Sequence, residues 1–257
     1  MNQPTTLFLH GGPGLSAIAE RELYGDSLDV YWWDQPRFEV LFARPYQALL
    51  DDTVLQAKRL AGHGKVNLLA HSFGARLALD TARRLPARIG AVTFVAPTFD
   101  VTRTLVRLAE HLATYTRNPA RLLAAVHRAT RAGAGFADVW TLIEAIGEVP
   151  DYLNAYWGPD AEHRRRWFFE VIATKPWVDF NTCKVILEDF LSIPASDTPT
   201  SVTGPVTLVL GVHDVLVDAA AAERAWRCYF PHATTRLVNA GHFVHLEAPS
   251  QLWLPDS

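Results

Sequence analysis

The sequence predicts a doubly wound α/β fold, in which a mostly parallel sheet of six strands carries helices on both faces and an inserted helical lid. Short, continuously apolar runs alternate with amphipathic helical patterns, as expected for parallel strands covered on both sides. The alternation is interrupted once, by about one hundred residues of purely helical pattern. The 257 residues, 49% of them hydrophobic, suffice for one large core without a disulfide framework.

Six apolar runs are predicted as strands. They span residues 5–9, 29–33, 65–70, 91–96, 206–210 and 235–238. The clearest helical patterns follow the second and third runs: residues 46–64, with Gly62 and Gly64 near the end, and residues 73–86, which stop at Pro86. Strands that alternate with helices imply a parallel sheet with right-handed crossovers.

The interruption is predicted to be a lid of residues 99–198, inserted between the fourth and fifth strands of a core formed by residues 1–98 and 199–257. Helical patterns cover residues 100–117, 118–133, 136–149, 160–175 and 181–191. Asn118 is expected to cap the second of these helices, with Pro119 at its first position. A segment rich in Pro, Ser and Thr, residues 192–205, is typical of a linker back to the core.

Composition argues against several classes of partner. The net charge of −3 gives no electrostatic basis for binding nucleic acid. The sequence contains no run of eighteen apolar residues, and its start lacks the basic region of a signal peptide, so we expect neither a membrane span nor secretion. Cys183 and Cys228 have no metal or redox spacing, which favours a reducing compartment, although one disulfide stays possible. We therefore expect a cytoplasmic protein.

Three polar residues stand where predicted strands end. Ser72 lies between the third strand and a helix in "AHSFG", which is close to the nucleophile elbow G-x-S-x-G, with Ala70 in place of the first glycine. Asp214 follows the fifth strand in "GVHD", and His242 follows the sixth strand in "AGHF". Each residue alone has a simpler explanation, as a helix cap, a turn residue or a surface histidine.

The three residues together predict nucleophilic catalysis. The carboxyl ends of parallel strands meet at one rim of the sheet, where open α/β sheets bind ligands. A serine hydroxyl is a weak nucleophile, so a histidine must take its proton and a carboxylate must orient the histidine. The order Ser, Asp, His along the chain is the one that this architecture requires.

The glycine turn "HGGPG" after the first strand is predicted to supply an oxyanion hole beside Ser72. We expect Gly12 to offer one backbone N–H and Phe73 the other, with Gly11 shaping the turn. Pro13 has no N–H to donate. Such donors typically lower the barrier by ~3–4 kcal/mol each.

These motifs resemble the α/β-hydrolase superfamily, and "HGGPG" resembles its proline iminopeptidase branch in particular. The resemblance covers nearly all of the core through "HGGPG", "WWDQPR", the elbow, "GVHD" and "AGHFVHLEAP". It implies Ser72 as nucleophile, Asp214 as acid and His242 as base, with Gly12 and Phe73 as oxyanion donors.

The sequence also departs from this branch. The residues after "DQ" read "PRFEVLF" instead of R-G-x-G-x-S, and the elbow has Phe where the branch has Trp. The ending "GHFVHLEAP" is more similar to esterases and carbon–carbon hydrolases. Too few residues precede the first predicted strand for the two antiparallel strands with which the superfamily usually begins. The exposed sheet edge this leaves could be covered in a homodimer.

Two other classes of function compete with a hydrolase. Residues 12–17 match G-x-G-x-x-A, and Asp34 lies twenty residues beyond Gly14, as in a dinucleotide-binding fingerprint. That alternative leaves the three strand-end residues unexplained. A small-molecule receptor that keeps its triad also stays open.

The aromatic content of the predicted lid favours an apolar pocket over Ser72 and a small-molecule substrate. We expect Gly11, His71, Trp157, Trp167 and Trp177 to contact the substrate. The cleaved bond stays open between amide, ester, thioester and carbon–carbon. Four lid carboxylates could hold the free amine of an iminopeptidase substrate, although each is first a candidate for a solvated helix face: Glu144, Glu148, Glu170 and Glu188.

Other polar residues near the motifs are expected to play supporting parts. His245 and Asp34 should stabilise the surroundings of the site, and His10 should tie down the glycine turn. His242, His245 and Asp214 lack the spacing of a metal site such as H-E-x-x-H. We predict neither a metal nor a cofactor.

Overall fold

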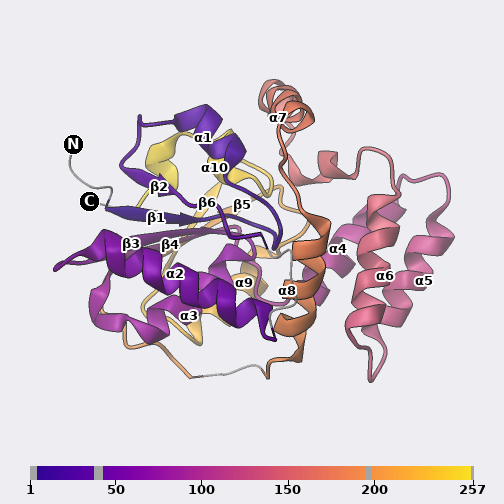
Figure 1. Cartoon of the computed structure of the whole chain (residues 1–257). Coiled ribbons are helices and arrows are strands. Elements are labelled where there is room, and N and C mark those ends of the chain that lie inside the picture. The colour runs from indigo at the N-terminus through magenta and orange to yellow at the C-terminus, as the bar shows by residue number, and fades with distance from the viewer. Residues whose placement is uncertain (1–4, 38–42, 195–197, 256–257) are drawn as a thin grey trace.

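A computed structural model describes residues 5–37, 43–194 and 198–255, and its centre is a six-stranded, entirely parallel sheet (Figure 1). The strands are β1 (Thr6–Leu9), β2 (Val30–Trp32), β3 (Val66–His71), β4 (Ile89–Val95), β5 (Val206–Gly211) and β6 (Thr234–Val238). Their order in space is β2-β1-β3-β4-β5-β6, with β1 and β3 adjacent at the point where the order reverses. The predicted fold class is confirmed, and in the described chain no strand precedes β1.

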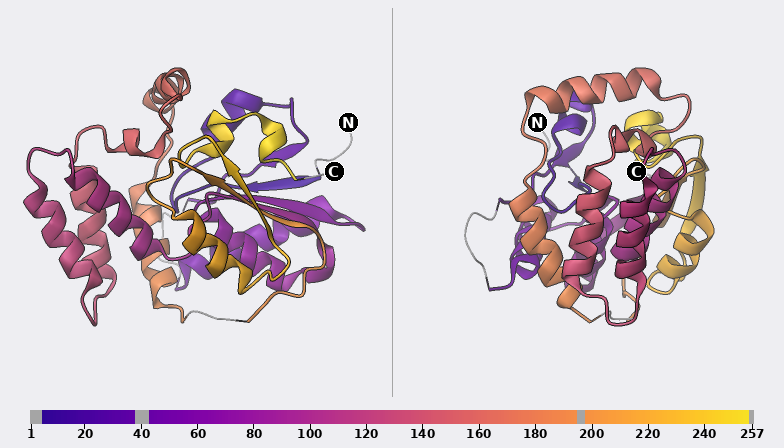
Figure 2. Two further views of the ribbon diagram at one scale, coloured as in Figure 1. Left: turned by 180° about the vertical axis from the view of Figure 1, so that it is seen from behind. Right: turned by 90° about the vertical axis from the view of Figure 1, so that its right-hand side faces the viewer.

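Helices cover both faces of this sheet, which explains why the strands read as continuous apolar runs. Leu7 and Leu9 belong to the core on one face, and Phe8 between them belongs to the core on the other. The first face carries α2 (Pro45–Ala61), α3 (Gly74–Arg84) and α9 (Ala219–Arg227), and the second carries α1 (Ile18–Tyr24) and α10 (Val244–Glu247) (Figures 1 and 2).

Two differences from the predicted helices have a clear local cause. Helix α2 ends at Ala61, because Gly62 takes a φ of +52°, which is left-handed backbone that favours glycine. Helix α1 was not predicted, because seven residues are too few to establish an apolar periodicity.

Five helices lie between β4 and β5 in the chain. They are α4 (Val101–Ala113), α5 (Pro119–Thr130), α6 (Phe136–Gly147), α7 (Glu162–Thr174) and α8 (Phe180–Ser192). Helices α4, α5 and α6 pack together beyond the carboxyl ends of the strands, while α8 lies against α2 (Figures 1 and 2). Pro119 takes the first position of α5 as predicted, and Asn118 is its N-cap residue. The side chain of Asn118, however, makes no capping hydrogen bond.

Parts of three predicted segments fall outside the residues that the structure describes. They are residues 1–4 and 256–257 of the predicted core, residues 38–42 of the divergent "PRFEVLF" loop, and residues 195–197 of the predicted linker. Among the helices that the structure describes, none is long and apolar enough to cross a bilayer.

Gly241 marks a close approach between the loop after β6 and the segment that joins α6 to α7. A Cβ atom at this position would lie 2.5 Å from the carbonyl carbon of Trp157 and 2.6 Å from the backbone nitrogen of Gly158. Because both neighbours are backbone atoms, they cannot move aside as a flexible side chain could. A glycine is therefore required here for the two segments to meet.

Gly241→Ala should lower the free energy of unfolding by about 1–3 kcal/mol, because the added methyl group forces these two backbones apart. Gly147→Ala is the matched control, since a Cβ atom there meets nothing within 4 Å and Gly147 ends a helix. That control should be neutral or slightly stabilising, by up to about 1 kcal/mol. Chemical denaturation of the two variants measures the difference. Equal stabilities would contradict the close approach.

Candidate active site

Ser72 occupies a strained turn between β3 and α3. Its φ of +51° lies in the left-handed region, which a non-glycine residue adopts only where its surroundings enforce it. The Ser72 N–H donates to the carbonyl of Val95 at 3.0 Å, which anchors the turn to β4. Gly74 lets α3 start close to β1, because a Cβ atom there would lie 2.2 Å from the carbonyl oxygen of Leu9. Ala70, in place of the motif's first glycine, is completely buried and fits the sheet.

The three strand-end residues meet in one hydrogen-bonded chain. His242 Nε2 lies 3.0 Å from Ser72 Oγ, and His242 Nδ1 lies 2.8 Å from Asp214 Oδ2. The other carboxylate oxygen of Asp214 accepts hydrogen bonds from the N–H groups of Leu216 at 2.8 Å and Val217 at 3.0 Å. Asp214 therefore binds the Nδ1–H of His242, which leaves Nε2 free to accept the proton of Ser72.

The imidazole of His242 and the carboxylate of Asp214 are shielded from water. The side chains of His242 and Asp214 are each 1% exposed. The His242 N–H donates to the carbonyl of Tyr156 at 2.7 Å, so the segment between α6 and α7 holds the histidine loop in place. Burial strengthens the hydrogen bonds of the chain, because few water molecules can compete for the same groups.

Two backbone N–H groups belong to residues that line the cavity over Ser72. Gly12 and Phe73 both line it, and neither N–H donates a hydrogen bond within the described residues. Gly12 has a φ of +94° and Gly14 one of +79°, so the turn requires glycine at both positions. Free backbone donors beside a serine hydroxyl are a requirement of an oxyanion hole, so the arrangement is compatible with one.

His10 holds the glycine turn from inside the core, as predicted. The Gln35 N–H donates to His10 Nε2 at 3.3 Å, so Nδ1 carries the proton and donates to the carbonyl of Gly11 at 2.7 Å. Burial lowers the pKa of His10, which favours this neutral form.

The groups of the alternative dinucleotide fingerprint are engaged elsewhere. A Cβ atom at Gly14 would lie 2.5 Å from the carbonyl oxygen of Asp179, so the start of α8 occupies the space beside that glycine. Asp34 accepts a hydrogen bond from the Ala17 N–H at 2.9 Å and pairs with Arg21. These contacts give Asp34 the stabilising part predicted for it.

His71 lies beside His242, and His245 lies beside His71. His71 Nε2–H donates to the backbone carbonyl of His242 at 3.1 Å, and the rings of His71 and His245 are 4.4 Å apart. His245 Nε2 in turn lies 2.8 Å from a carboxylate oxygen of the buried Glu20. Burial, together with the neighbouring His245 and His242, holds the pKa of His71 well below its usual range, so His71 is neutral.

A cavity of about 210 Å³ opens over Ser72. Of the five residues expected to contact the substrate, Gly11, His71 and Trp177 line this cavity. Trp157 and Trp167 do not: both belong to a hydrophobic cluster beside the cavity, where Trp157 packs against Phe168 with ring centroids 5.4 Å apart. These two residues pack in the joint between α7 and the core and are not among the residues that line the cavity.

The lining of this cavity is mostly apolar and uncharged. None of the described residues that line it is an Asp, Glu, Lys or Arg. Its polar groups include the phenols of Tyr152 and Tyr156, which have no hydrogen-bond partner in the described chain. Burial raises the pKa of both phenols, and it raises the pKa of the nearby Cys183 thiol to about 12. All three groups are therefore neutral near pH 7.

Thr98 is a site residue that the sequence interpretation missed. Its hydroxyl lies 3.2 Å from Ser72 Oγ, and its N–H donates to the carbonyl of Ser72 at 3.1 Å. It follows β4, so the rule that found the other strand-end residues also indicated this one. A hydroxyl in this place can hold Ser72 Oγ in the rotamer that faces His242.

Thr98→Val should lower kcat/KM about 5- to 10-fold, the effect of one lost hydrogen bond of about 1 kcal/mol. Thr98→Ser restores the hydroxyl and should stay within about twofold of the wild type. The measurement is initial-rate kinetics on a nitrophenyl ester. A loss in Thr98→Ser with none in Thr98→Val would show that the methyl group, which valine keeps, matters and the hydroxyl does not.

The fold and the site together place the protein in the class of α/β hydrolases. The chain belongs to the alpha/beta hydrolase fold family, whose model matches residues 4–249. No curated protein matches the chain at a significant level.

Solved structures resemble the chain over almost its whole length. A proline iminopeptidase-related protein from Thermus thermophilus has 26% identity and a TM-score of 0.68, over 96% of this chain and 85% of that one. A thermophilic esterase from Thermogutta terrifontis has 19% identity and a TM-score of 0.62, over the same shares. An epoxide hydrolase from Bacillus megaterium has 14% identity and a TM-score of 0.57, over 96% and 89%. The last two similarities concern the fold alone.

Proposed function

We propose that the protein is a serine hydrolase that cleaves small, neutral, largely apolar esters through an acyl-enzyme. The observation that carries the proposal is the Ser72–His242–Asp214 chain, with links of 3.0 Å and 2.8 Å, opening into a cavity without a charged side chain among its described lining residues.

Acylation begins at Ser72. Its Oγ attacks the ester carbonyl carbon while His242 Nε2 takes the hydroxyl proton, and Asp214 stabilises the imidazolium that forms. The carbonyl oxygen becomes an oxyanion and accepts hydrogen bonds from the N–H groups of Gly12 and Phe73. When the tetrahedral intermediate collapses, the carbon–oxygen bond to the leaving group breaks, and His242 returns the proton to the departing alkoxide.

Deacylation repeats these steps with water as the nucleophile. His242 takes a proton from water, the hydroxide adds to the acyl carbon, and Ser72 Oγ leaves with the proton that His242 then donates. The products are an alcohol and a carboxylic acid, which ionises at neutral pH.

The cavity favours an ester over the amide of a free-amine substrate. An iminopeptidase-type substrate carries an ammonium group, and burying such a group without a partner costs several kcal/mol. No described carboxylate lines the cavity to pair with it. The four lid glutamates considered for this part all have exposed side chains outside the lining: Glu144, Glu148, Glu170 and Glu188.

The proposal includes a lid of residues 99–198 over a core of residues 1–98 and 199–257. The cavity lining supports this division, because Gly12 and Phe73 come from the core, while Leu105, Trp177 and Phe180 come from the inserted helices or the segments beside them. The lid then determines which acyl and alcohol groups fit, and the core performs the chemistry.

A matched pair of esters tests the substrate class. 2-Naphthyl 4-methylpentanoate and the 2-naphthyl ester of leucine differ only in the α-amino group. Because of the cost of burying that ammonium, we expect kcat/KM to be about 100-fold higher for the ester without it.

Leucine 2-naphthylamide completes the panel as the amide counterpart. If the two leucine compounds were turned over faster than 2-naphthyl 4-methylpentanoate, the ester assignment would be overturned in favour of an iminopeptidase-type enzyme. No turnover of any of the three would overturn the proposal of a hydrolase for such acyl groups.

A further inference from the structure

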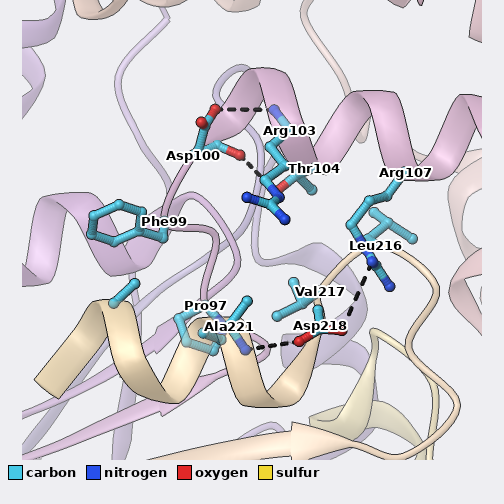
Figure 3. A pocket seen from close by; sticks show the side chains of 12 residues that line it. Pro97, Phe99, Asp100, Arg103, Thr104, Arg107, Leu216, Val217, Asp218 and Ala221 are labelled. Carbon is cyan, nitrogen blue, oxygen red and sulfur yellow. Dashed lines mark hydrogen bonds and ion pairs between the residues drawn. The ribbon is translucent and has the colours of Figure 1, made fainter.

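A second cavity, of about 220 Å³, lies between α4 and α9, where Leu216 and Val217 form part of its lining (Figure 3). We call it the α4/α9 cavity. Its floor is apolar, formed by Pro97, Leu216, Val217 and three alanines of α9. Its volume is below that of a site for a drug-sized ligand, so its occupant must be small.

The opposite wall of the α4/α9 cavity carries two arginines. Arg103 and Arg107 lie one helical turn apart on α4 and project towards α9 (Figure 3). Arg107 Nη1 is 3.9 Å from Asp218 Oδ2, which is too far for a hydrogen bond, and Arg107 Nε is buried without a partner in the described chain. The guanidinium of Arg103 makes no hydrogen bond or ion pair with a described residue.

The two carboxylates beside these arginines are engaged in capping helices. Asp100 Oδ1 accepts from the Arg103 N–H at 3.0 Å at the start of α4, and Asp218 Oδ1 accepts from the Ala221 N–H at 2.7 Å at the start of α9. They balance the formal charge of the two arginines but leave guanidinium donors unused. Planar guanidinium donors match the geometry of a carboxylate, so an apolar floor opposite two arginines fits a carboxylate on a short hydrocarbon chain.

The α4/α9 cavity adjoins the catalytic one. Thr104 and Leu216 line both cavities, so a single layer of side chains separates them. The N–H groups of Leu216 and Val217 also hold Asp214 Oδ1. An occupant of the α4/α9 cavity would therefore touch the segment that orients the triad carboxylate.

We propose that the α4/α9 cavity binds a short-chain aliphatic carboxylate, the chemical class of the acid that ester hydrolysis releases. The link to the product rests on the proposed function, whereas binding itself does not. The catalytic cavity presents no described cation to such an anion, and the neighbouring cavity presents two.

Binding of sodium hexanoate, measured by isothermal titration calorimetry, tests this inference without turnover. We expect a Kd on the order of 1 mM for the wild type and for Ser72→Ala. The double variant Arg103→Gln/Arg107→Gln should bind at least about tenfold more weakly, because it keeps the shape of the wall and loses both charges. 1-Hexanol, which lacks the carboxylate, should bind equally to the wild type and the double variant.

Arg121→Gln/Arg128→Gln is the matched control, because it removes two charges from the neighbouring helix α5. It should bind hexanoate like the wild type, and thermal melts should show that both double variants fold. Equal hexanoate affinity in the two double variants, or no binding to the wild type at 10 mM (about ten times the expected Kd), would overturn the site. No step of this titration requires catalysis. Hexanoate binding can therefore be observed even if the ester panel shows no turnover, and turnover of the esters can be observed even if hexanoate does not bind.

Discussion

Ser72→Ala is expected to lower kcat on a short-chain nitrophenyl ester by about 10⁵-fold or more, because the variant has no nucleophile for the acyl-enzyme. The fold should be unaffected, since alanine occupies the same turn with the same φ of +51° and loses only a hydroxyl. Steady-state kinetics measure the loss, and mass spectrometry of enzyme treated with a fluorophosphonate should show an adduct on the wild type only.

Ser27→Ala is a suitable control for this experiment. Ser27 is an exposed serine whose hydroxyl donates to the carbonyl of Tyr24 at 2.5 Å, far in the sequence from the strand ends of the site. Its kinetics should match the wild type. If Ser72→Ala retained more than a small fraction of the wild-type rate, Ser72 could not be the nucleophile.

Asp214→Asn is expected to reduce kcat by about 10⁴-fold with little change in overall structure. The carboxylate at 2.8 Å keeps the proton of His242 on Nδ1, so Nε2 can accept the proton of Ser72. An amide in its place can donate to Nδ1, which stabilises the opposite tautomer and puts a hydrogen on Nε2. The imidazolium that forms during catalysis would also lose its counter-charge.

Asp218→Asn offers a close comparison, because Asp218 lies four residues further along the same loop and caps α9 through the Ala221 N–H. Asparagine caps helices about as well as aspartate, so activity and stability should change little. Kinetics and denaturation of the two variants, side by side, separate the loss of the triad carboxylate from the loss of any acidic side chain in this loop. Comparable activity in both would remove Asp214 from the mechanism.

The strands and the three strand-end residues could be predicted because they depend on local features of the chain. Strands covered on both faces must be apolar throughout, so all six runs were located within about two residues of their ends. The parallel arrangement then brings all carboxyl ends to one rim, which predicted that Ser72, Asp214 and His242 would meet before any distance was known.

The lining of the cavity could not be predicted in the same way. An aromatic side chain stabilises a core joint and a substrate pocket equally well, so composition does not distinguish Trp177, which lines the cavity, from Trp157 and Trp167, which do not. Thr98 escaped notice because a single threonine after a strand has no motif around it. Its role depends on the 3.2 Å contact between its hydroxyl, after β4, and the hydroxyl of Ser72, after β3.

By itself, the amino-acid sequence determined the fold class, the six strands and the residues that stand at their ends, because apolar periodicity and turn chemistry act over a few neighbouring residues. Only the tertiary structure decided which groups face the cavity, how α8 fills the space beside Gly14, and that two arginines of α4 lie over an apolar floor on α9. Those features involve residues that are one hundred or more positions apart in the sequence. Their proximity in space follows from packing and not from any local pattern.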